Sequence, residues 1–405
     1  MRALFKNIID KRSRKLHGLP VLALALLALV ACVGERNGLD QGLLKEARVV
    51  EFDSSFIRIW GDAKLDEINI AELSQAPELK IVNDPVNGKR RQDFLVLSGG
   101  GAKGAFGAGL LNGWTTSGVR PEFSVVTGVS TGAIIAPFAF LGSKYDHLLT
   151  EFYTTYSTKD LVRIIGLGGV LGGSSAASSK PLERLIAKYV TPEVLRAVAT
   201  EYQSGRYLLV GTTNLDAQRP VIWNMGEIAR QGNEGALKLF RRVILASISI
   251  PGAFPPVLID VRAGGKVGKE LHVDGGTTDN AFLAPVQLRL KNVADTRSKG
   301  VTKRIFVVVN SNLAPKAEIV KASTINITAR SIDTLIKQQT GGDVLRLYDY
   351  SRDNDIQFNY LEIPDEFDVQ PKELFDPVYM KALYKLGVKT GLANNGWKKA
   401  PRELQ

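Results

Sequence analysis

Short apolar runs alternate with amphipathic stretches along the middle of the chain. A continuous apolar run, typical of a buried parallel strand, covers residues 94–98, a second strand is expected at 123–127, and further strands are expected at 207–213, 221–225 and 304–310. Helical spacing of apolar positions covers residues 131–141 and 237–249. Strands that alternate with helices predict an α/β fold of three layers, α/β/α, in which helices cover both faces of a mainly parallel central sheet.

The remaining segments suggest four parts of the chain. Residues 1–31 have the composition of an export signal, and residues 32–88 are polar, with one strand-like run at 49–60, as expected of a tether and an N-terminal extension. Residues 89–312 hold the central domain. Residues 313–405 contain helical patterns at 319–339, 344–350 and 377–394 and a strand pattern at 358–363, and are expected to complete the fold.

The first 32 residues resemble a bacterial lipoprotein signal. Basic residues are followed by the uncharged apolar run 19–30, which is shorter than the roughly 20 residues that a spanning helix needs. The run ends in Leu29-Val30-Ala31-Cys32, which looks like a lipobox, and Cys32 is the only cysteine of the chain. This resemblance implies that Cys32 is acylated. Val33, in place of an aspartate, implies sorting to the outer membrane, on its periplasmic side.

The charge of the chain is compatible with membrane lipids as partners and gives no sign of nucleic acid. The chain has a formal net charge of +11, and without residues 1–31 the excess falls to +6. A modest positive excess suits a protein beside anionic membrane lipids. There is no dense basic block with interleaved aromatic residues, so nucleic acid is not an expected partner.

A glycine- and serine-rich stretch at 166–179 is compatible with a lid, although a flexible connection is the preferred interpretation.

Two glycine motifs carry the candidate chemistry. Gly99-Gly100-Gly101-Ala102-Lys103-Gly104 follows an apolar run and offers backbone N–H groups that could cradle an anion. Gly128-Val129-Ser130-Thr131-Gly132 has the pattern of a nucleophile elbow, in which the glycines let a strand turn sharply into a helix and expose the serine hydroxyl. Together they favour acyl transfer, with Ser130 as the nucleophile.

A nucleotide site is the competing interpretation of the first motif. Dinucleotide sites need an acidic residue about 20 residues further on, at the end of the next strand. Glu122 has the right spacing but precedes its strand, and that strand runs directly into the serine motif. Acyl transfer therefore remains the preferred prediction.

The base that activates Ser130 is expected to be Asp274. The three histidines are His17, His147 and His272. The first lies in the signal, the second is expected on the surface of the helix that begins at the elbow, and no later histidine follows His272. In Leu271-His272-Val273-Asp274-Gly275-Gly276, a short strand ends in an acid followed by two glycines, and a buried carboxylate with a raised pKa can take a proton directly.

The three motifs in this order resemble the signature of the patatin-like phospholipase family. The proline turn within residues 246–256, with Asn280 and Pro285, supports the resemblance, which covers about residues 90–310. It implies a patatin-like fold and a Ser130–Asp274 dyad without histidine. It also implies an oxyanion hole at Gly100 and Gly101, with Gly99, Lys103 and Gly104 completing that loop. Ser98 departs from the aspartate that many members carry, which leaves the details of the loop open.

The sequence therefore predicts a lipid acyl hydrolase that needs no metal or other cofactor and acts on phospholipids or lysophospholipids. Two alternatives stay open at this point. One is a non-catalytic envelope lipoprotein that binds lipid or a partner in the cleft. The other is a thioesterase or peptidase that uses the same dyad.

Overall fold

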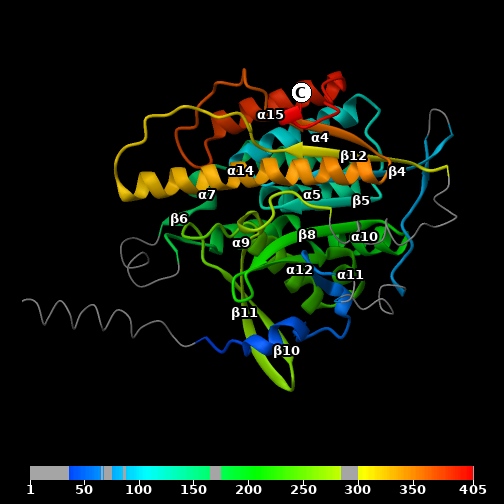
Figure 1. Ribbon diagram of the computed structural model, residues 1–405, viewed down its shortest axis with the longest axis vertical. Helices are drawn as coiled ribbons and strands as arrows, with labels where there is room; N and C mark the ends of the chain where they lie inside the picture. Colours follow the sequence, from blue (N-terminus) through cyan, green and yellow to red (C-terminus); the bar gives the residue numbers. More distant parts are fainter. Residues whose placement is uncertain are drawn as a thin grey trace, which may run out of the picture.

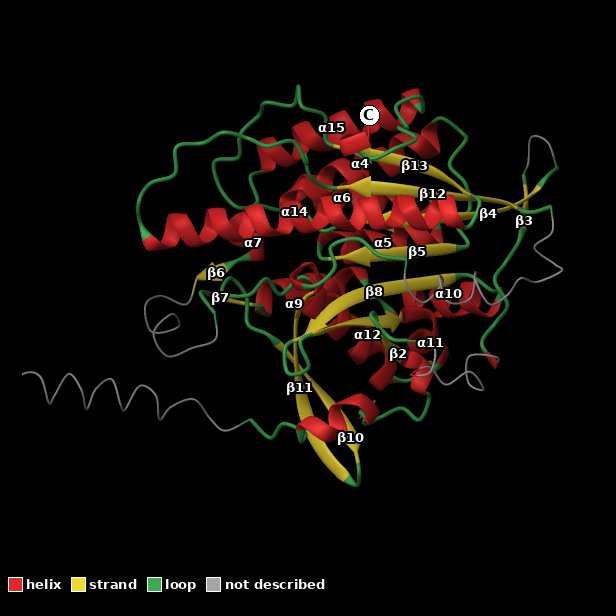
Figure 2. Ribbon diagram, viewed as in Figure 1, coloured by secondary structure: helices red, strands yellow, loops and turns green. Residues whose placement is uncertain are grey.

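The computed structural model of the protein describes residues 36–64, 67, 75–84, 88–164, 175–283 and 300–404. Within these ranges an 11-stranded sheet crosses the molecule, in the order β1-β10-β11-β8-β5-β4-β12-β13 with β2, β3 and β9 off this path. Figures 1 and 2 show helices packed on both sides of it. The prediction of an α/β fold with a mainly parallel central sheet is confirmed.

The centre of the sheet is parallel. β4 pairs in parallel with β5 on one side and β12 on the other, β5 pairs in parallel with β8, and β12 with β13. These five strands are Arg90–Leu97 (β4), Val125–Val129 (β5), Tyr207–Asn214 (β8), Thr302–Val309 (β12) and Ile356–Glu362 (β13). Their residues are almost all buried, which is why the sequence shows them as continuous apolar runs.

Antiparallel strands extend the sheet beyond β8. β11 pairs antiparallel with β8 and forms a long hairpin with β10, and β1 pairs with β10. β9 pairs with β8 and β2 with β9, while β3 pairs with β4. Their bounds are Arg48–Val49 (β1), Arg58–Trp60 (β2), Val82–Asn83 (β3), Arg219–Asn224 (β9), Val257–Ala263 (β10) and Lys266–Asp274 (β11). The strand expected at 49–60 is thus divided between β1 and β2.

Most helices cover one face of the sheet. Alternate strand residues such as Leu95, Val126 and Leu208 pack there with apolar side chains of the helices. The helices of the main core are Gly104–Thr116 (α4), Thr131–Leu141 (α5), Asp146–Thr155 (α6), Thr158–Leu161 (α7), Lys180–Tyr189 (α9), Pro192–Gln203 (α10), Met225–Arg230 (α11), Glu234–Ser247 (α12) and Pro377–Ala393 (α15). A separate small pair, Arg163–Ile164 (β6) and Ala177–Ser178 (β7), lies at the periphery.

In the described part of the chain, one long helix, α14, covers the opposite face. It spans Thr324–Asp353, and its Val344 and Leu347 pack against the other set of strand residues, Phe94, Val96 and Ile305 among them. The prediction of two helices at 319–339 and 344–350 is therefore wrong. Gly341 and Gly342 suggest a break, but the packing of the following residues outweighs the roughly 1 kcal/mol that each glycine costs in a helix. Figure 1 shows α14 crossing the sheet and extending beyond it on one side.

Candidate active site

Ser130 lies on a sharp turn between a strand and a helix. It directly follows β5, precedes α5 and has a φ of 53°, a conformation that is uncommon for a residue with a side chain. A Cβ at Gly128 or Gly132 would overlap a backbone carbonyl, so only glycine lets the strand and the helix approach this closely. The turn has the geometry of a nucleophile elbow, with the serine at its apex.

A second serine fixes the elbow from the helix α12. Ser247 accepts a hydrogen bond at 3.0 Å from the backbone N–H of Ser130 and donates one at 2.7 Å to the carbonyl of Gly211 on β8. Sequence reasoning did not single out Ser247. The sequence signal for Ser247 is its place in the stretch 246–256, which contains the proline turn. In the same stretch, the carbonyl of Ser249 accepts a hydrogen bond from the backbone N–H of Asp274.

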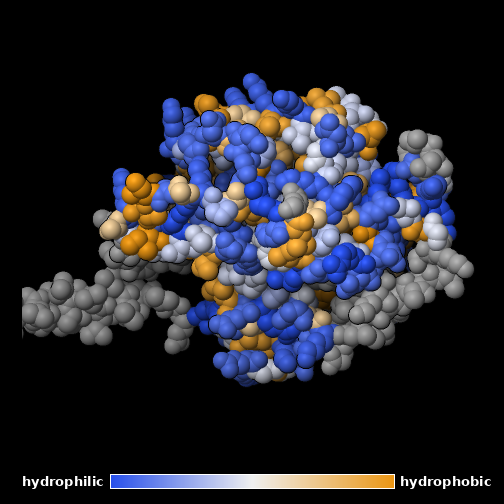
Figure 3. All heavy atoms as spheres, turned by 45° about the horizontal axis from the view of Figure 1, so that its top comes forward, coloured by the Kyte–Doolittle hydropathy of each residue, from blue (hydrophilic) through white to orange (hydrophobic). Residues whose placement is uncertain are grey.

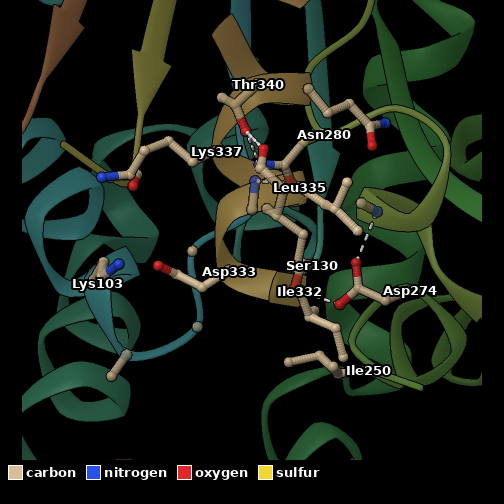
Figure 4. A pocket seen from close by; sticks show the side chains of 18 of the residues that line it. Lys103, Ser130, Ile250, Asp274, Asn280, Ile332, Asp333, Leu335, Lys337 and Thr340 are labelled. Atoms are coloured by element: carbon tan, nitrogen blue, oxygen red, sulfur yellow. Dashed lines mark hydrogen bonds between the residues drawn. The ribbon is translucent and has the colours of Figure 1, made fainter. Parts of the chain in front are cut away.

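Asp274 ends β11 and meets the serine hydroxyl. The Ser130 Oγ donates a hydrogen bond to the Asp274 Oδ2 at 2.7 Å, shown as a dashed line in Figure 4. The backbone N–H of Gly276 donates to the other carboxylate oxygen at 2.8 Å. Ser130 is 7% exposed and Asp274 is 5% exposed. The fold thus brings together two residues that lie 144 positions apart in the sequence.

The surroundings of Asp274 favour its neutral form. Burial raises the pKa of this carboxyl to about 7, although the hydrogen bonds from Ser130 and Gly276 act to lower it. Among the residues that the structure describes, no arginine, lysine or histidine pairs with it. Near neutral pH, Asp274 can therefore both hold and accept a proton, which is what a general base requires.

The glycine loop after β4 offers two free donors beside the serine. Gly100 approaches the carbonyl of Asn310 so closely that a Cβ would overlap it, and Gly101 has a φ of 57°. Within the described part of the chain, the N–H groups of Gly100 and Gly101 donate to no acceptor. Gly99 differs, because its N–H donates to the side-chain oxygen of Asn280 at 3.1 Å.

The other motif glycines permit close packing around the dyad. A Cβ at Gly104 would overlap the side chain of Thr131, so glycine lets α4 begin against the start of α5. A Cβ at Gly275 would press on the carbonyl of Gly211 at 2.6 Å. The turn after Asp274 can therefore lie directly on β8.

Asn280 connects the glycine loop to α14. Its side-chain nitrogen donates to the Thr340 Oγ1 at 2.6 Å, and its backbone N–H donates to the Asp343 Oδ2 at 2.7 Å. Burial raises the pKa of Asp343 to about 7, against the opposing effect of Arg346. Thr340 and Asp343 were missed in the sequence. Their only signal is their spacing, three residues apart, on the inner face of a helix.

Ser98 and Asn310 join two strands below the loop. The Ser98 Oγ donates to the carbonyl of Gly99 at 2.8 Å and accepts the N–H of Asn310 at 2.9 Å. The Asn310 side chain accepts the N–H of Gly107 at 3.1 Å and donates to the carbonyl of Ser98 at 2.9 Å. Ser98 thus joins the ends of β4 and β12, and Asn310 joins them to α4.

The rings of the two described histidines have partners other than Ser130 and Asp274. His147 is exposed on α6 and not, as expected, on the elbow helix, because α5 ends at Leu141. His272 is fully buried on β11, where its ring contacts the Thr212 Oγ1 at 3.0 Å and the Glu270 Oε2 at 3.1 Å. Burial lowers the pKa of His272 below its ordinary value, although Glu270 acts to raise it. Neither ring is hydrogen-bonded to Ser130 or Asp274.

A cavity of about 570 Å³ opens in front of the dyad. Its wall combines the glycine loop, Ser130 and Asp274 with apolar side chains from α14, from the turn that precedes β10 and from the loop that precedes α15. The apolar residues are Ile250, Pro251, Ile332, Leu335, Ile336 and Leu374. Figure 4 shows Lys103, Asp333 and Lys337 together on one side of the cavity. Burial and the nearby Lys103 ammonium lower the pKa of Lys337.

Several sequence predictions lie outside the described residues. These are Cys32 with the signal segment, Pro285, and residues 166–174 of the glycine- and serine-rich stretch. Glu122 precedes β5 and pairs with Lys80 at 2.7 Å, so it is not at the end of a strand. Among the described residues, no helix is long and apolar enough for a membrane span, and no cluster of three or more His, Cys, Asp or Glu could hold a metal ion.

Comparison with known proteins gives a family for the central part of the chain. Residues 95–286 match the family described as "Patatin-like phospholipase". No curated protein matches the chain. Among solved structures, the "Crystal structure of VipD from Legionella pneumophila" matches with 13% sequence identity and a TM-score of 0.32, over 79% of this chain and 70% of that chain. The family match covers the elbow, the glycine loop from Ser98 onward and the Asp-Gly-Gly turn, and it assigns residues 95–286 to the patatin-like phospholipase family.

Proposed function

We propose that this protein, whose residues 95–286 match the patatin-like phospholipase family, hydrolyses fatty-acyl esters through a Ser130–Asp274 dyad. Membership of the family supports lipid acyl hydrolysis in general. The observation that carries the specific proposal is the hydrogen bond of 2.7 Å from the Ser130 hydroxyl to a buried carboxylate that has no cationic partner among the described residues. A serine needs such a base to become a nucleophile.

In the first half of the reaction, Asp274 takes the proton of Ser130 as Oγ attacks the ester carbonyl carbon. The free N–H groups of Gly100 and Gly101 stabilise the resulting oxyanion, and such a donor is typically worth about 2.7–4 kcal/mol in the transition state. As the tetrahedral intermediate collapses, the bond to the alcohol oxygen breaks, and Asp274 returns the proton to the leaving alkoxide. The products are a free alcohol and an acyl-serine.

In the second half, water attacks the acyl-serine while Asp274 accepts a proton from that water. The bond between the acyl carbon and Oγ then breaks, the proton returns to Oγ, and a fatty acid leaves. The same carboxylate serves both halves, so the chemistry proposed here needs no imidazole.

The cavity supports a phospholipid or lysophospholipid as the substrate. Its apolar wall suits an acyl chain, and Lys103 and Lys337 place two positive charges at the same cavity, where a phosphate could be bound. A simple thioester or peptide substrate leaves these two lysines without a role. Membrane lipids are thus proposed both as substrate and as the site of anchoring.

The main experiment compares wild type with Ser130→Ala on a short-chain nitrophenyl ester and on defined phospholipids, with products identified by mass spectrometry. We expect wild type to release fatty acid and the variant to show no turnover above background. A fluorophosphonate probe should label wild type at Ser130. Absence of labelling would support the binding-protein alternative, and turnover by the variant would contradict the proposed nucleophile.

We also propose that Cys32 is acylated and holds the protein at the outer membrane, on the periplasmic side. The proposal is supported by the lipobox-like sequence before Cys32 and by the residue Val33 that follows it. Metabolic labelling with a palmitate analogue, compared between wild type and Cys32→Ser, tests it. Label in the variant, or recovery of wild type in the inner-membrane fraction, would contradict it.

A further inference from the structure

The N-terminal part of α14 extends beyond the body of the protein. From Asn326 to Leu335 the side chains are exposed, apart from half-buried Arg330, whereas Thr340, Asp343 and Val344 are each only 1% exposed. Figure 1 shows this end of the helix projecting past the edge of the sheet. The loop that follows β12 runs out to the start of the helix. A helix segment with little tertiary packing lacks the main source of helix stability.

Large apolar side chains gather on this projecting segment. On the helix, Ile327 is 51% exposed, Ile332 is 38% exposed and Leu335 is 68% exposed. In the preceding loop, Ile319 is 99% exposed and Val320 is 36% exposed. Figure 3 shows hydrophobic spheres at the side of the molecule where α14 projects. Such grouping is characteristic of a surface that a partner covers, because single exposed apolar residues are common but clusters are not.

The charges around the segment favour an anionic partner. Residues 316–335 carry Lys316, Lys321 and Arg330 against two acidic residues, Glu318 and Asp333. Both acidic residues pair with Arg330, at 3.2 Å and 3.7 Å respectively. Among the described residues, no carboxylate pairs with Lys316 or Lys321. Exposed apolar side chains on the helix, with lysines in the loop that precedes it, are the composition of a segment that can lie in a membrane interface.

The segment is continuous with the cavity that holds the dyad. Ile332, Leu335 and Ile336 line that cavity from α14, and Leu374, which is 55% exposed, lies at the same wall. An apolar path therefore leads from the exposed end of the helix toward Ser130. A lipid could move along this path without exposing its acyl chain to water.

We propose that residues 316–335, the projecting end of α14 with its preceding loop, insert into the surface of an anionic phospholipid bilayer and open the cavity toward it. This inference rests on the proposed lipid substrate for its purpose, but the docking itself requires no catalysis. A second copy of the chain could cover the same side chains, and the experiment distinguishes it from a bilayer.

The experiment places an environment-sensitive fluorophore on the full chain with Cys32→Ser and Ser130→Ala, so that the engineered cysteine is the only one and no lipid is consumed. The label is attached at Ile327→Cys, at Ile319→Cys or, as a matched control, at Val267→Cys. Val267 is 57% exposed on the β10–β11 hairpin, away from α14. Vesicles contain phosphatidylcholine with or without phosphatidylglycerol, and doxyl-labelled lipids serve as quenchers.

We expect the labels at positions 319 and 327 to shift to shorter wavelength and to be quenched with phosphatidylglycerol vesicles, and the label at 267 to be unaffected. Weaker responses are expected with phosphatidylcholine alone. Labels at 319 and 327 that behave like the label at 267 would overturn the proposal. So would labels that are already shielded without vesicles, because this outcome indicates a second copy of the chain.

A kinetic comparison separates docking from catalysis. The double variant Ile319→Asn/Ile327→Asn changes side chains that do not line the cavity. It should keep wild-type turnover of a dissolved short-chain ester and lose about tenfold or more on phospholipid vesicles, while Val267→Asn loses nothing. Equal loss on both substrates would contradict docking. If wild type hydrolysed neither the dissolved ester nor the phospholipid vesicles, the proposed function would be wrong. The fluorescence experiment would still test membrane docking.

Discussion

Two buried carboxylates four residues apart on β11 have opposite surroundings. Glu270 meets the guanidinium of Arg58 with both oxygens and the ring of His272 with one. Burial would raise the pKa of Glu270, but the attraction of Arg58 outweighs it and holds the pKa at about 2. Asp274 is also buried, has only neutral donors around it, and has a pKa raised to about 7. A paired cation thus keeps Glu270 ionised, and the absence of one raises the pKa of Asp274, as the proposed role of Asp274 as a base requires.

The largest expected effect comes from removing the base. Asp274→Asn keeps the size of the side chain but cannot accept the proton of Ser130, so kcat/KM on a short-chain ester should fall by about 10²–10⁴-fold. The matched control is Glu270→Gln, which changes the structural carboxylate of the same strand. If Glu270→Gln lost as much activity per folded molecule as Asp274→Asn, the distinction between the two sites would be wrong.

Disrupting the ion pair of Arg58 and Glu270 should lower the stability of the fold. Arg58→Met leaves Glu270 buried without its cation, and breaking a buried ion pair in this way costs about 3–5 kcal/mol. We expect the free energy of unfolding to fall by this order in urea titrations, while kcat of the folded fraction changes little. Stability unchanged by Arg58→Met would show that the pair is not structural.

The pH dependence of activity should follow Asp274. The base must be ionised, so kcat/KM should rise about tenfold per pH unit below the pKa of about 7 and level off above it. Asp343 has a similarly raised pKa, and Asp343→Asn is therefore the control. If the pH profile of kcat/KM keeps its midpoint in Asp343→Asn and becomes flat in Asp274→Asn, the midpoint belongs to Asp274. A midpoint lost in Asp343→Asn contradicts the assignment.

Stability should change with pH in opposite directions at the two carboxylates. Native Asp274 binds its proton more tightly than the unfolded chain does, so its contribution to stability falls as pH rises from about 4 to about 7. Glu270 contributes above about pH 4.5 and loses its contribution as pH falls toward 2. Asp274→Asn should thus raise Tm by about a few degrees at pH 8 and by less at pH 4. Calorimetry at both pH values checks this, and an equal shift at both would contradict it.

The smallest effect concerns the link from α14 to the glycine loop. Thr340→Val removes one hydrogen bond to Asn280 and leaves the side chains of Ser130 and Asp274 unchanged. We expect kcat to fall about two- to tenfold, the equivalent of one ordinary hydrogen bond, with little change in KM for a dissolved ester. Thr340→Ser keeps the hydroxyl and should restore kcat. Equal loss in both variants would indicate packing instead of positioning.

The local parts of the site were predictable because each has a sequence pattern. Continuous apolar runs predicted the parallel strands, and α5 was expected at the residues where it lies. The shortest runs were displaced, as at β5, which begins and ends two residues later than predicted. The pairing of Ser130 with Asp274 was expected from the strand that ends in Asp-Gly-Gly and from the family resemblance, and their catalytic roles stay a prediction.

The parts that sequence reasoning missed depend on contacts between distant residues. Arg58 and Glu270 lie 212 positions apart, and no pattern indicates that the arginine reaches β11. Thr340 and Asn280 lie 60 positions apart, and their bond exists only because α14 crosses the sheet as one helix. Local propensity argued for a break at Gly341, and tertiary packing decided otherwise.

The most direct test is the pH-dependent rate at which a fluorophosphonate labels Ser130 in wild type, His272→Gln and Asp274→Asn. It measures activation of the serine without any later step. We predict a rate that rises through a pKa of about 7 in wild type and in His272→Gln, and that is lost in Asp274→Asn. Loss of labelling in His272→Gln with the fold intact, or undiminished labelling in Asp274→Asn, would contradict a dyad in which a carboxylate activates the serine directly.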